Sequence, residues 1–180
     1  GVLSEEVTAL REAFGFPGMR ILQFAFGTDP GAHTFLPEVY VRNTVAYTGT
    51  HDNDTVVSWF HDRGEHSSRS PEQCEKERRY CLSHLGIPGR EIHWEMIGVL
   101  LHSKAGAVVF PMQDVLGLGN EARMNVPGTT SGNWRWRLQP GQLTNAIQAR
   151  LREATVKAGR NARTAATVPQ PSTTMEGNPA

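Results

Sequence analysis

The chain has 180 residues, with 18 Lys plus Arg, 18 Asp plus Glu and a net charge of zero. This length suffices for one ordinary domain with a core. The balanced charge favours neither nucleic acid nor an anionic membrane as a partner, and no apolar run reaches the ~20 residues that span a bilayer. We expect neither partner.

The two cysteines, Cys74 and Cys81, lie seven positions apart in one predicted helix. That spacing is roughly 10 Å along a helix axis, too far for a disulfide. We expect both to be small core residues, as in a reducing cytosol, with no catalytic or zinc role.

The first predicted elements are a helix and a strand. The helix begins after the cap Ser4 and ends at Gly15, and its expected buried face is formed by Val7, Leu10 and Phe14. Residues 19–26 are apolar on both alternating faces apart from Gln23, which is typical of a strand covered on both sides. Residues 27–43 then form a long loop, and loops of that length are more often functional than idle.

A polar cluster follows the second predicted strand, residues 45–48. Gly49 ends this strand, the polar residues 51–54 come next, and residues 56–60 supply the apolar face of a helix. In a parallel α/β fold this turn lies at the carboxyl end of the strand, where ligands bind. A structural alternative is that Thr50 or Asp54 simply caps the helix.

The second half of the chain repeats the alternation. Ser70, Pro71 and Gln73 form a capping box that starts a helix, and Gly86 ends it. The remaining expected elements are a helix ending near 106, a strand at 107–110, a short helix around 115–118, a loop at 119–141, a closing helix at 143–151 and a disordered tail from 154 to 180.

This order predicts an α/β fold with parallel strands. Three strands cannot close a barrel, which needs eight, yet both strand faces have a buried composition. We therefore expect the chain to be part of a larger (β/α) fold.

Three long motifs then carry a family resemblance. Residues 16–27 (FPGMRILQFAFG) resemble the sixth barrel strand of the 4-α-glucanotransferases, also called amylomaltases or disproportionating enzymes, glycoside hydrolase family 77. Residues 42–55 (RNTVAYTGTHDNDT) resemble the seventh-strand signature, and residues 122–129 with 132–137 (ARMNVPGT, GNWRWR) resemble the loop after strand eight. The resemblance covers residues 1–153 and implies about strands 6 to 8 of an α-amylase-like (β/α)8 TIM barrel.

The resemblance implies a retaining transfer of α-1,4-glucan segments to the 4-hydroxyl of an acceptor sugar. Such chemistry needs two carboxyl groups about 5 to 5.5 Å apart, one as nucleophile and one as acid/base. In this family these follow strands four and five, the latter in an Ala-Glu-Asp-Leu-Gly segment of which Gly1 would be the last residue. We expect both to lie upstream and the chain alone, lacking the N-terminal part of its barrel, to be inactive.

The same resemblance assigns the candidate site residues. Asp52 matches the transition-state stabiliser, and His51 matches the histidine that donates to the same sugar. Asn125 is expected to reach this subsite, and Arg123 to fix the loop or touch sugar. The remaining candidates are Phe26 and Gly27, expected to border the acceptor groove. The family chemistry uses neither metal nor cofactor, and its partners are α-1,4-glucans in the cytoplasm or, for a plant or alga, a plastid.

Other interpretations of the same residues stay open. Asp54 is expected to be a cap or loop brace, and Asp114 has no role in the family. For Trp134 and Trp136 we favour packing over stacking on glucose rings. We expect His33, His61 and His66 to be solvated.

Two further function classes are alternatives to the transferase. The first is a metal-dependent phosphohydrolase that uses a cluster of His51, Asp52, Asp54, His61 and Asp62. Adjacent side chains on one turn diverge, whereas metal ligands converge from several segments, so this alternative is disfavoured. The second is a non-catalytic carbohydrate-binding fragment.

Overall fold

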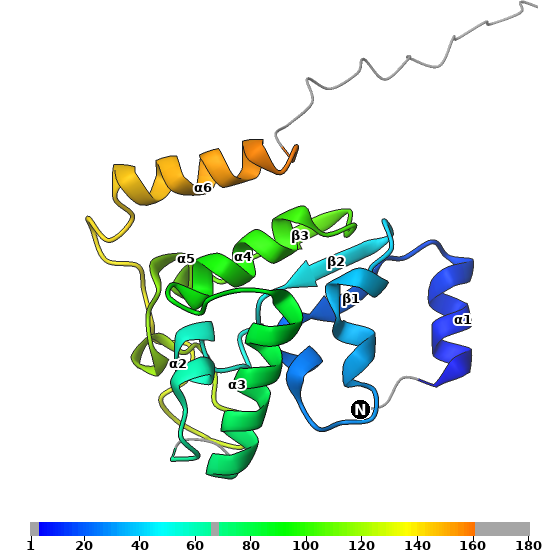
Figure 1. Cartoon of the computed structure of the whole chain (residues 1–180), viewed down its shortest axis with the longest axis horizontal. Coiled ribbons are helices and arrows are strands. Elements are labelled where there is room, and N and C mark those ends of the chain that lie inside the picture. The colour runs from blue at the N-terminus through cyan, green and yellow to red at the C-terminus, as the bar shows by residue number, and fades with distance from the viewer. Residues whose placement is uncertain (1–3, 66–68, 161–180) are drawn as a thin grey trace, which may run out of the picture.

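A computed structural model describes residues 4–65 and 69–160 of the chain. Within these residues the strands β1 (Gly18–Ile21), β2 (Thr44–Tyr47) and β3 (Ala107–Val109) form one parallel sheet in the order β1-β2-β3 (Figure 1). The helices are α1 (Glu5–Ala13), α2 (Val56–His61), α3 (Pro71–Leu85), α4 (Ile92–His102), α5 (Met112–Leu116) and α6 (Asn145–Lys157), with short 3-10 turns η1 (Leu22–Phe26), η2 (Ala32–Phe35), η3 (Pro37–Val39) and η4 (Asn120–Ala122). The predicted α/β class with parallel strands is confirmed.

The register brings the carboxyl ends of the three strands to one edge. Ile21 pairs with Tyr47, and Tyr47 pairs with Val109. The segments that follow the strands therefore all begin at this edge, as parallel strands require.

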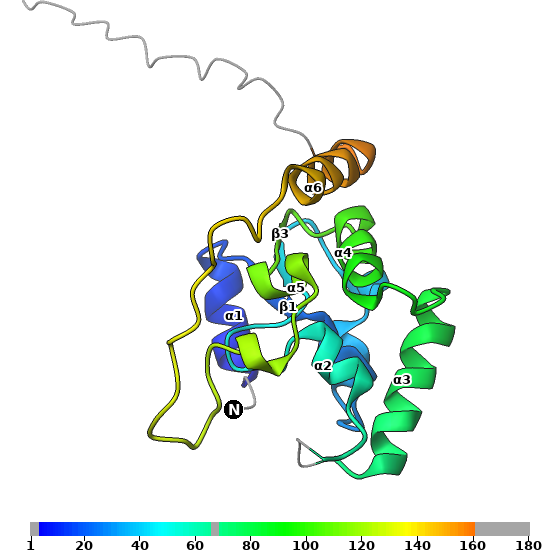
Figure 2. The ribbon, with the colours of Figure 1, turned by 90° about the vertical axis from the view of Figure 1, so that its left-hand side faces the viewer.

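One face of the sheet is covered by helices. Ala46 of β2 is fully buried in a cluster that includes Val56 of α2, Cys81 of α3 and Met96 of α4. Figures 1 and 2 show α4 between α6 on one side and α2 and α3 on the other. A second cluster joins α4 and α5 to α6, through Ile97, Leu101, Val115, Ile147 and Leu151.

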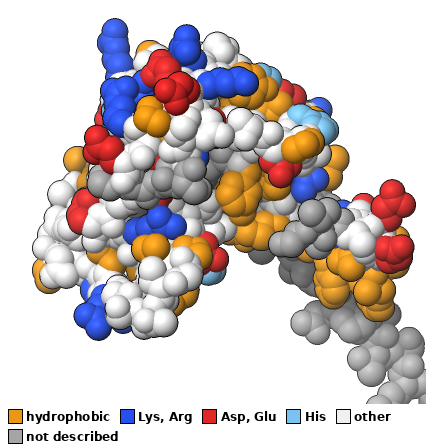
Figure 3. Space-filling view, turned by 90° about the horizontal axis from the view of Figure 1, so that it is seen from below, with side chains coloured by type: hydrophobic (Ala, Val, Ile, Leu, Met, Phe, Trp, Pro, Cys, Tyr) orange, Lys and Arg blue, Asp and Glu red, His pale blue; other side chains and the backbone are white. Residues whose placement is uncertain are grey.

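The other face of the sheet is open in the part of the chain that the structure describes. Met19 of β1 and Val109 of β3 are 48% and 45% exposed, so the expected burial of both strand faces is not found. Helix α1 buries none of its residues, and its expected inner face is exposed at Val7, Leu10 and Phe14. Apolar side chains gather in one part of the surface shown in Figure 3. The spacing of apolar residues predicts which side of a helix is buried, but it does not tell whether other residues of this chain bury that side.

The first strand is shorter than predicted. The expected strand at 19–26 ends at Ile21, and residues 22–26 form the 3-10 turn η1. A 3-10 turn places residues three apart on the same side, and Leu22 and Ala25 are both buried. A largely apolar run without alternation is compatible with a strand or with a 3-10 turn, so it does not determine where the strand ends.

Helix starts and stops follow the sequence signals. The Ser4 side chain accepts from the Val7 N–H, Ser70 and Gln73 form the predicted capping box, and Gly86 ends α3 with φ of +63°. The cap of α2 is Thr55, which accepts from the Ser58 N–H; it is neither Thr50 nor Asp54. Both cysteines are buried, and burial raises the pKa of the Cys81 thiol to about 12, which fits a core residue.

Helix α6 runs beyond the predicted boundary between domain and tail at 153. It continues to Lys157, and the Thr155 hydroxyl donates to the Leu151 carbonyl inside it. The Arg160 guanidinium then donates to the carbonyls of Leu101, Ser103 and Ala105 at 2.5 to 2.8 Å. Residues 154–160 are therefore ordered against α4, and the rest of the expected tail, 161–180, lies outside the described residues.

We predict that Arg160→Ala lowers the free energy of unfolding by about 1–3 kcal/mol, because three half-buried carbonyls lose their donor. Chemical denaturation measures the change. Arg152→Ala, at an exposed position of α6, is the control and should change stability by less than about 0.5 kcal/mol. Equal stability of the two variants would show that Arg160 does not fasten this end of the chain.

Candidate active site

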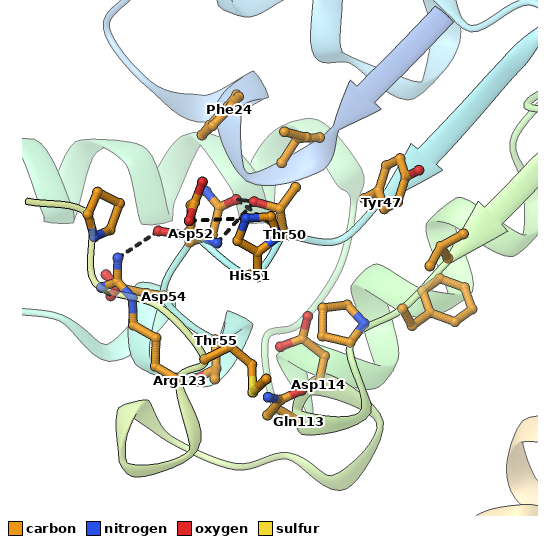
Figure 4. Close-up of a pocket in the computed structure, with 18 of the residues that line it drawn as sticks. Phe24, Tyr47, Thr50, His51, Asp52, Asp54, Thr55, Gln113, Asp114 and Arg123 are labelled. Carbon is orange, nitrogen blue, oxygen red and sulfur yellow. Dashed lines mark hydrogen bonds and ion pairs between the residues drawn. The ribbon is translucent and has the colours of Figure 1, made fainter. Parts of the chain in front are cut away.

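A pocket of about 910 Å³ opens at the carboxyl edge of the sheet. Its lining comes from the strands β1, β2 and β3, the turn after β2, helix α5 and the loop after η4 (Figure 4). Polar side chains in this lining belong mostly to three segments and include Thr50, His51, Asp52, Asn53, Asp54, Thr55, Gln113, Asp114 and Arg123. The location is the one expected for a ligand site in a parallel α/β fold.

The turn after β2 is folded by its own polar residues. Asn53 Oδ1 accepts from the backbone N–H of Thr50 at 2.9 Å and from its hydroxyl at 2.8 Å. Thr50 Oγ1 in turn accepts from the Asp52 N–H at 3.3 Å. A Cβ at Gly49 would lie 2.8 Å from Gln23 Nε2, so a side chain here would displace the Gln23 amide. The side chains of His51 and Asp52 take no part in these bonds.

His51, Asp52 and Asn125 come together as the resemblance implied. His51 Nε2 lies 3.3 Å from Asp52 Oδ1, and Asn125 Nδ2 donates to the same oxygen at 2.6 Å. The Asn125 N–H also donates to the His51 carbonyl at 3.1 Å. The His51 and Asp52 side chains remain about half exposed, at 54% and 49%, so a ligand can reach them from the pocket.

Arg123 joins the turn to the loop after η4. Its guanidinium forms an ion pair with Asp54 and donates to the Asp52 carbonyl at 2.6 Å, while Nε donates to the Asn125 carbonyl at 2.8 Å. The Arg123 and Asp54 side chains are only 16% and 12% exposed. Of the two roles expected for Arg123, these contacts favour fixing the loop, and Asp54 is a loop brace as expected.

Two residues of this network were not singled out from the sequence. Gln23 of η1 donates to the Asp54 carbonyl at 2.9 Å, and Asn120 of η4 donates to Asp54 Oδ1 at 3.0 Å. The signal for Gln23 was present, because it is the one polar residue between Ile21 and Phe26 and is buried. Asn120 lies in a loop with several polar residues, and nothing local distinguishes it.

Asp114 is a buried carboxylate behind the turn. It accepts from the Thr48 hydroxyl at 2.6 Å and from the Val56 N–H at 2.8 Å. Burial raises its pKa, against the two hydrogen bonds, which favour the charged form. Asp114 thus ties the end of β2 and the start of α2 to α5.

The other expected site residues lie elsewhere. Phe26 is buried against Trp59, with ring centroids 5.7 Å apart, and neither Phe26 nor Gly27 lines the pocket. The expectation that they border the acceptor groove stays a prediction, since this pocket is not identified as that groove. Phe26 belongs to the 3-10 turn η1 and is part of the buried core cluster.

The histidines are placed mostly as expected. His33 and His61 are exposed, and His66 lies outside the described residues. The metal alternative has no support, because Asp54 pairs with Arg123 and Asp62 pairs with Arg69. Among the described residues, no three His, Cys, Asp or Glu side chains converge as a metal site requires.

Comparison with known proteins supplies a family context. A family model described as 4-alpha-glucanotransferase matches residues 1–144. The chain is 45% identical over 162 residues to a 4-alpha-glucanotransferase of Synechocystis and 46% identical over 157 residues to one of Thermus thermophilus. These alignments cover 89% and 84% of the chain but only 30% of each relative.

A solved structure agrees in fold. The amylomaltase of Streptococcus agalactiae in complex with acarbose superposes with a TM-score of 0.78 at 31% identity, covering 89% of this chain and 30% of that one. The chain therefore spans about a third of the length of the proteins it matches. In the described portion of the chain, no helix has both the length and the apolar character that crossing a membrane requires.

We predict that Arg123→Ala lowers the free energy of unfolding by about 3 kcal/mol, because Asp54 loses its ionic partner in a largely buried place. Hydrogen exchange at the Asn125 amide, which bonds to His51, should also become faster. Arg135→Ala, at an exposed position of the same loop, is the control. Unchanged exchange at residue 125 in Arg123→Ala would contradict the bracing role.

We predict a pH-dependent stability difference between the wild type and Asp114→Asn. The folded-state pKa of Asp114 is raised above the ordinary value of 3.8. The destabilisation of the folded state by the buried carboxylate charge is therefore absent below pH 3.8 and develops as the pH rises through the folded pKa. The asparagine does not ionise, and its stability relative to the wild type should therefore increase over that window and then level off. Denaturation from pH 3 to 8 measures this difference.

Asp29→Asn, at an exposed position, serves as the control for the pH series. A constant or decreasing difference for Asp114→Asn would show that the buried carboxyl group does not titrate as its surroundings require.

Proposed function

The chain belongs to the 4-alpha-glucanotransferase family, and from this premise we propose that it contributes the transition-state-stabilising side of an active site that transfers α-1,4-glucan segments. The single observation that carries the proposal is the convergence of His51, Asp52 and Asn125 on an open pocket at the carboxyl edge of a parallel sheet.

The proposed place of the chain is about strands 6 to 8 of a (β/α)8 barrel. The exposed sheet face with Met19 and Val109, and the exposed apolar side of α1, support this place, because a closed barrel covers such surfaces. The coverage of about a third of each relative also supports it.

Asp52 is proposed to accept hydrogen bonds from hydroxyl groups of the sugar whose bond is broken. These bonds strengthen as the ring flattens toward an oxocarbenium ion. Asn125 and His51 both contact Asp52 Oδ1, so the carboxylate is oriented where it would meet the sugar. His51 is proposed to donate to the same sugar. The acarbose complex of the streptococcal amylomaltase supports a glucan-type ligand.

The bond-breaking nucleophile and acid/base are proposed to come from barrel segments other than this chain. Retaining transfer needs a pair of carboxyl groups about 5 to 5.5 Å apart in addition to the stabiliser. In the pocket described above, Asp54 is held by Arg123, and Asp114 is enclosed by Thr48 and Val56. We therefore propose that the chain alone binds glucan without turning it over.

A chimera tests the proposal. Residues 1–144 would replace the matching segment of the Synechocystis relative, which completes the barrel, and glucose release from maltotriose would be measured. We predict turnover by the chimera and a loss of about 10²- to 10³-fold in rate for Asp52→Asn within it.

Asp29→Asn in the chimera is the matched control and should retain the rate of the unmodified chimera. Full activity of the Asp52→Asn chimera would reject the assigned role. Turnover of maltotriose by the 180-residue chain alone would reject the proposed division of catalytic groups.

A further inference from the structure

We infer that Trp134 is a stacking residue for a sugar unit next to the one held by His51 and Asp52. The inference rests on the proposed function, since it assumes a glucan at these two residues. Its basis is the position and exposure of the indole and the backbone conformation of Trp134.

The Trp134 backbone is in a conformation that side chains rarely adopt. Its φ is +63°, and within residues 4–65 and 69–160 it is the one residue other than glycine with a positive φ. The left-handed region is costly for a residue with a Cβ, and such outliers persist where surrounding contacts hold them.

Those surrounding contacts are present on both sides of residue 134. The backbone N–H of Trp134 donates to the Met124 carbonyl at 2.6 Å, and Arg137 Nη1 donates to the Trp134 carbonyl at 2.9 Å. The neighbouring Asn133 accepts from the Val126 N–H at 2.9 Å, which closes the loop between them. This closure holds residue 134 close to the segment that carries Asn125.

The indole lies beside the site and is open to solvent. Its ring centroid is 5.0 Å from that of His51, at an interplanar angle of 42°. Trp134 is nevertheless 52% exposed, so the packing expected from the sequence is not its main environment. One side of the ring therefore contacts the imidazole, and much of the rest is available to a ligand.

A glucan chain fits this arrangement. Sugar rings present C–H faces that pack on aromatic surfaces, and their hydroxyl groups bond to polar side chains at the edge. His51 contacts both Asp52 and Trp134. A sugar at His51 and Asp52 accordingly places the next unit of the chain near the indole, where stacking adds affinity and selects for chain length.

Glucan titration of the chain tests this inference, with maltoheptaose as the probe. Nuclear magnetic resonance follows the Trp134 indole N–H together with the amides of His51 and Asp52. We expect all three signals to shift with one saturation curve. Trp134→Gly should weaken binding about 3- to 10-fold, and Trp134→Phe should restore most of the affinity.

The glycine variant is informative because glycine adopts the left-handed backbone without strain, so weaker binding does not report unfolding. Trp136→Phe, on the neighbouring and less exposed tryptophan, is the matched control and should bind as the wild type does.

The outcomes separate the two proposals. Shifts at His51 and Asp52 without a shift at Trp134, or equal affinity of Trp134→Gly, would overturn the stacking role and leave the proposed function standing. No saturable shift at any of the three would overturn both proposals.

Discussion

The guanidinium of Arg123 is the group on which the candidate site depends. It contacts the side chain of Asp54, the carbonyl of Asp52 and the carbonyl of Asn125, and so joins the turn after β2 to the loop after η4. A planar group with five donors makes these bonds together, whereas a lysine ammonium offers a single charged point. Because a largely buried ion pair also loses hydration, its main effect is on geometry and less on net stability.

Three aspartates line the same pocket and have different surroundings. Asp54 is held by Arg123 and Asn120, and Asp114 is enclosed by Thr48 and Val56. Asp52 alone among these three is about half exposed and is oriented by His51 and Asn125. The two enclosed carboxylates brace the site, and the Asp52 carboxylate remains accessible from the pocket. This division explains how a turn rich in Asp and Asn is both a structural and a functional element.

Local rules predicted what depends on neighbouring residues. The cap of α1 at Ser4, the capping box at Ser70 and the stop at Gly86 are bonds or conformations within one turn of chain, and all were found. The parallel α/β class followed from the order of the elements, and the convergence of His51, Asp52 and Asn125 followed from family motifs.

Features set by distant partners were missed or misassigned. The exposed face of α1 and the open side of the sheet depend on what lies beyond these residues, which periodicity cannot reveal. The end of β1 depends on how a largely apolar run packs. The contribution of Asn120 and the length of α6, with Arg160 at its end, required knowledge of which segments meet in space.

The turn after β2 is fastened to the rest of the site by bonds between residues far apart in the sequence. They join residues 66 to 73 positions apart, from Thr48, Asp52 and Asp54 to residues 114–125. Contacts of such sequence separation carry a loop-closure cost that must be met before the contacts stabilise the fold. A nascent polypeptide that has emerged only as far as α4 holds every residue of the turn and none of these partners. The contact by which Asn125 orients the Asp52 carboxylate therefore requires the chain beyond β3, so the local motif at residues 51–54 does not by itself hold that orientation.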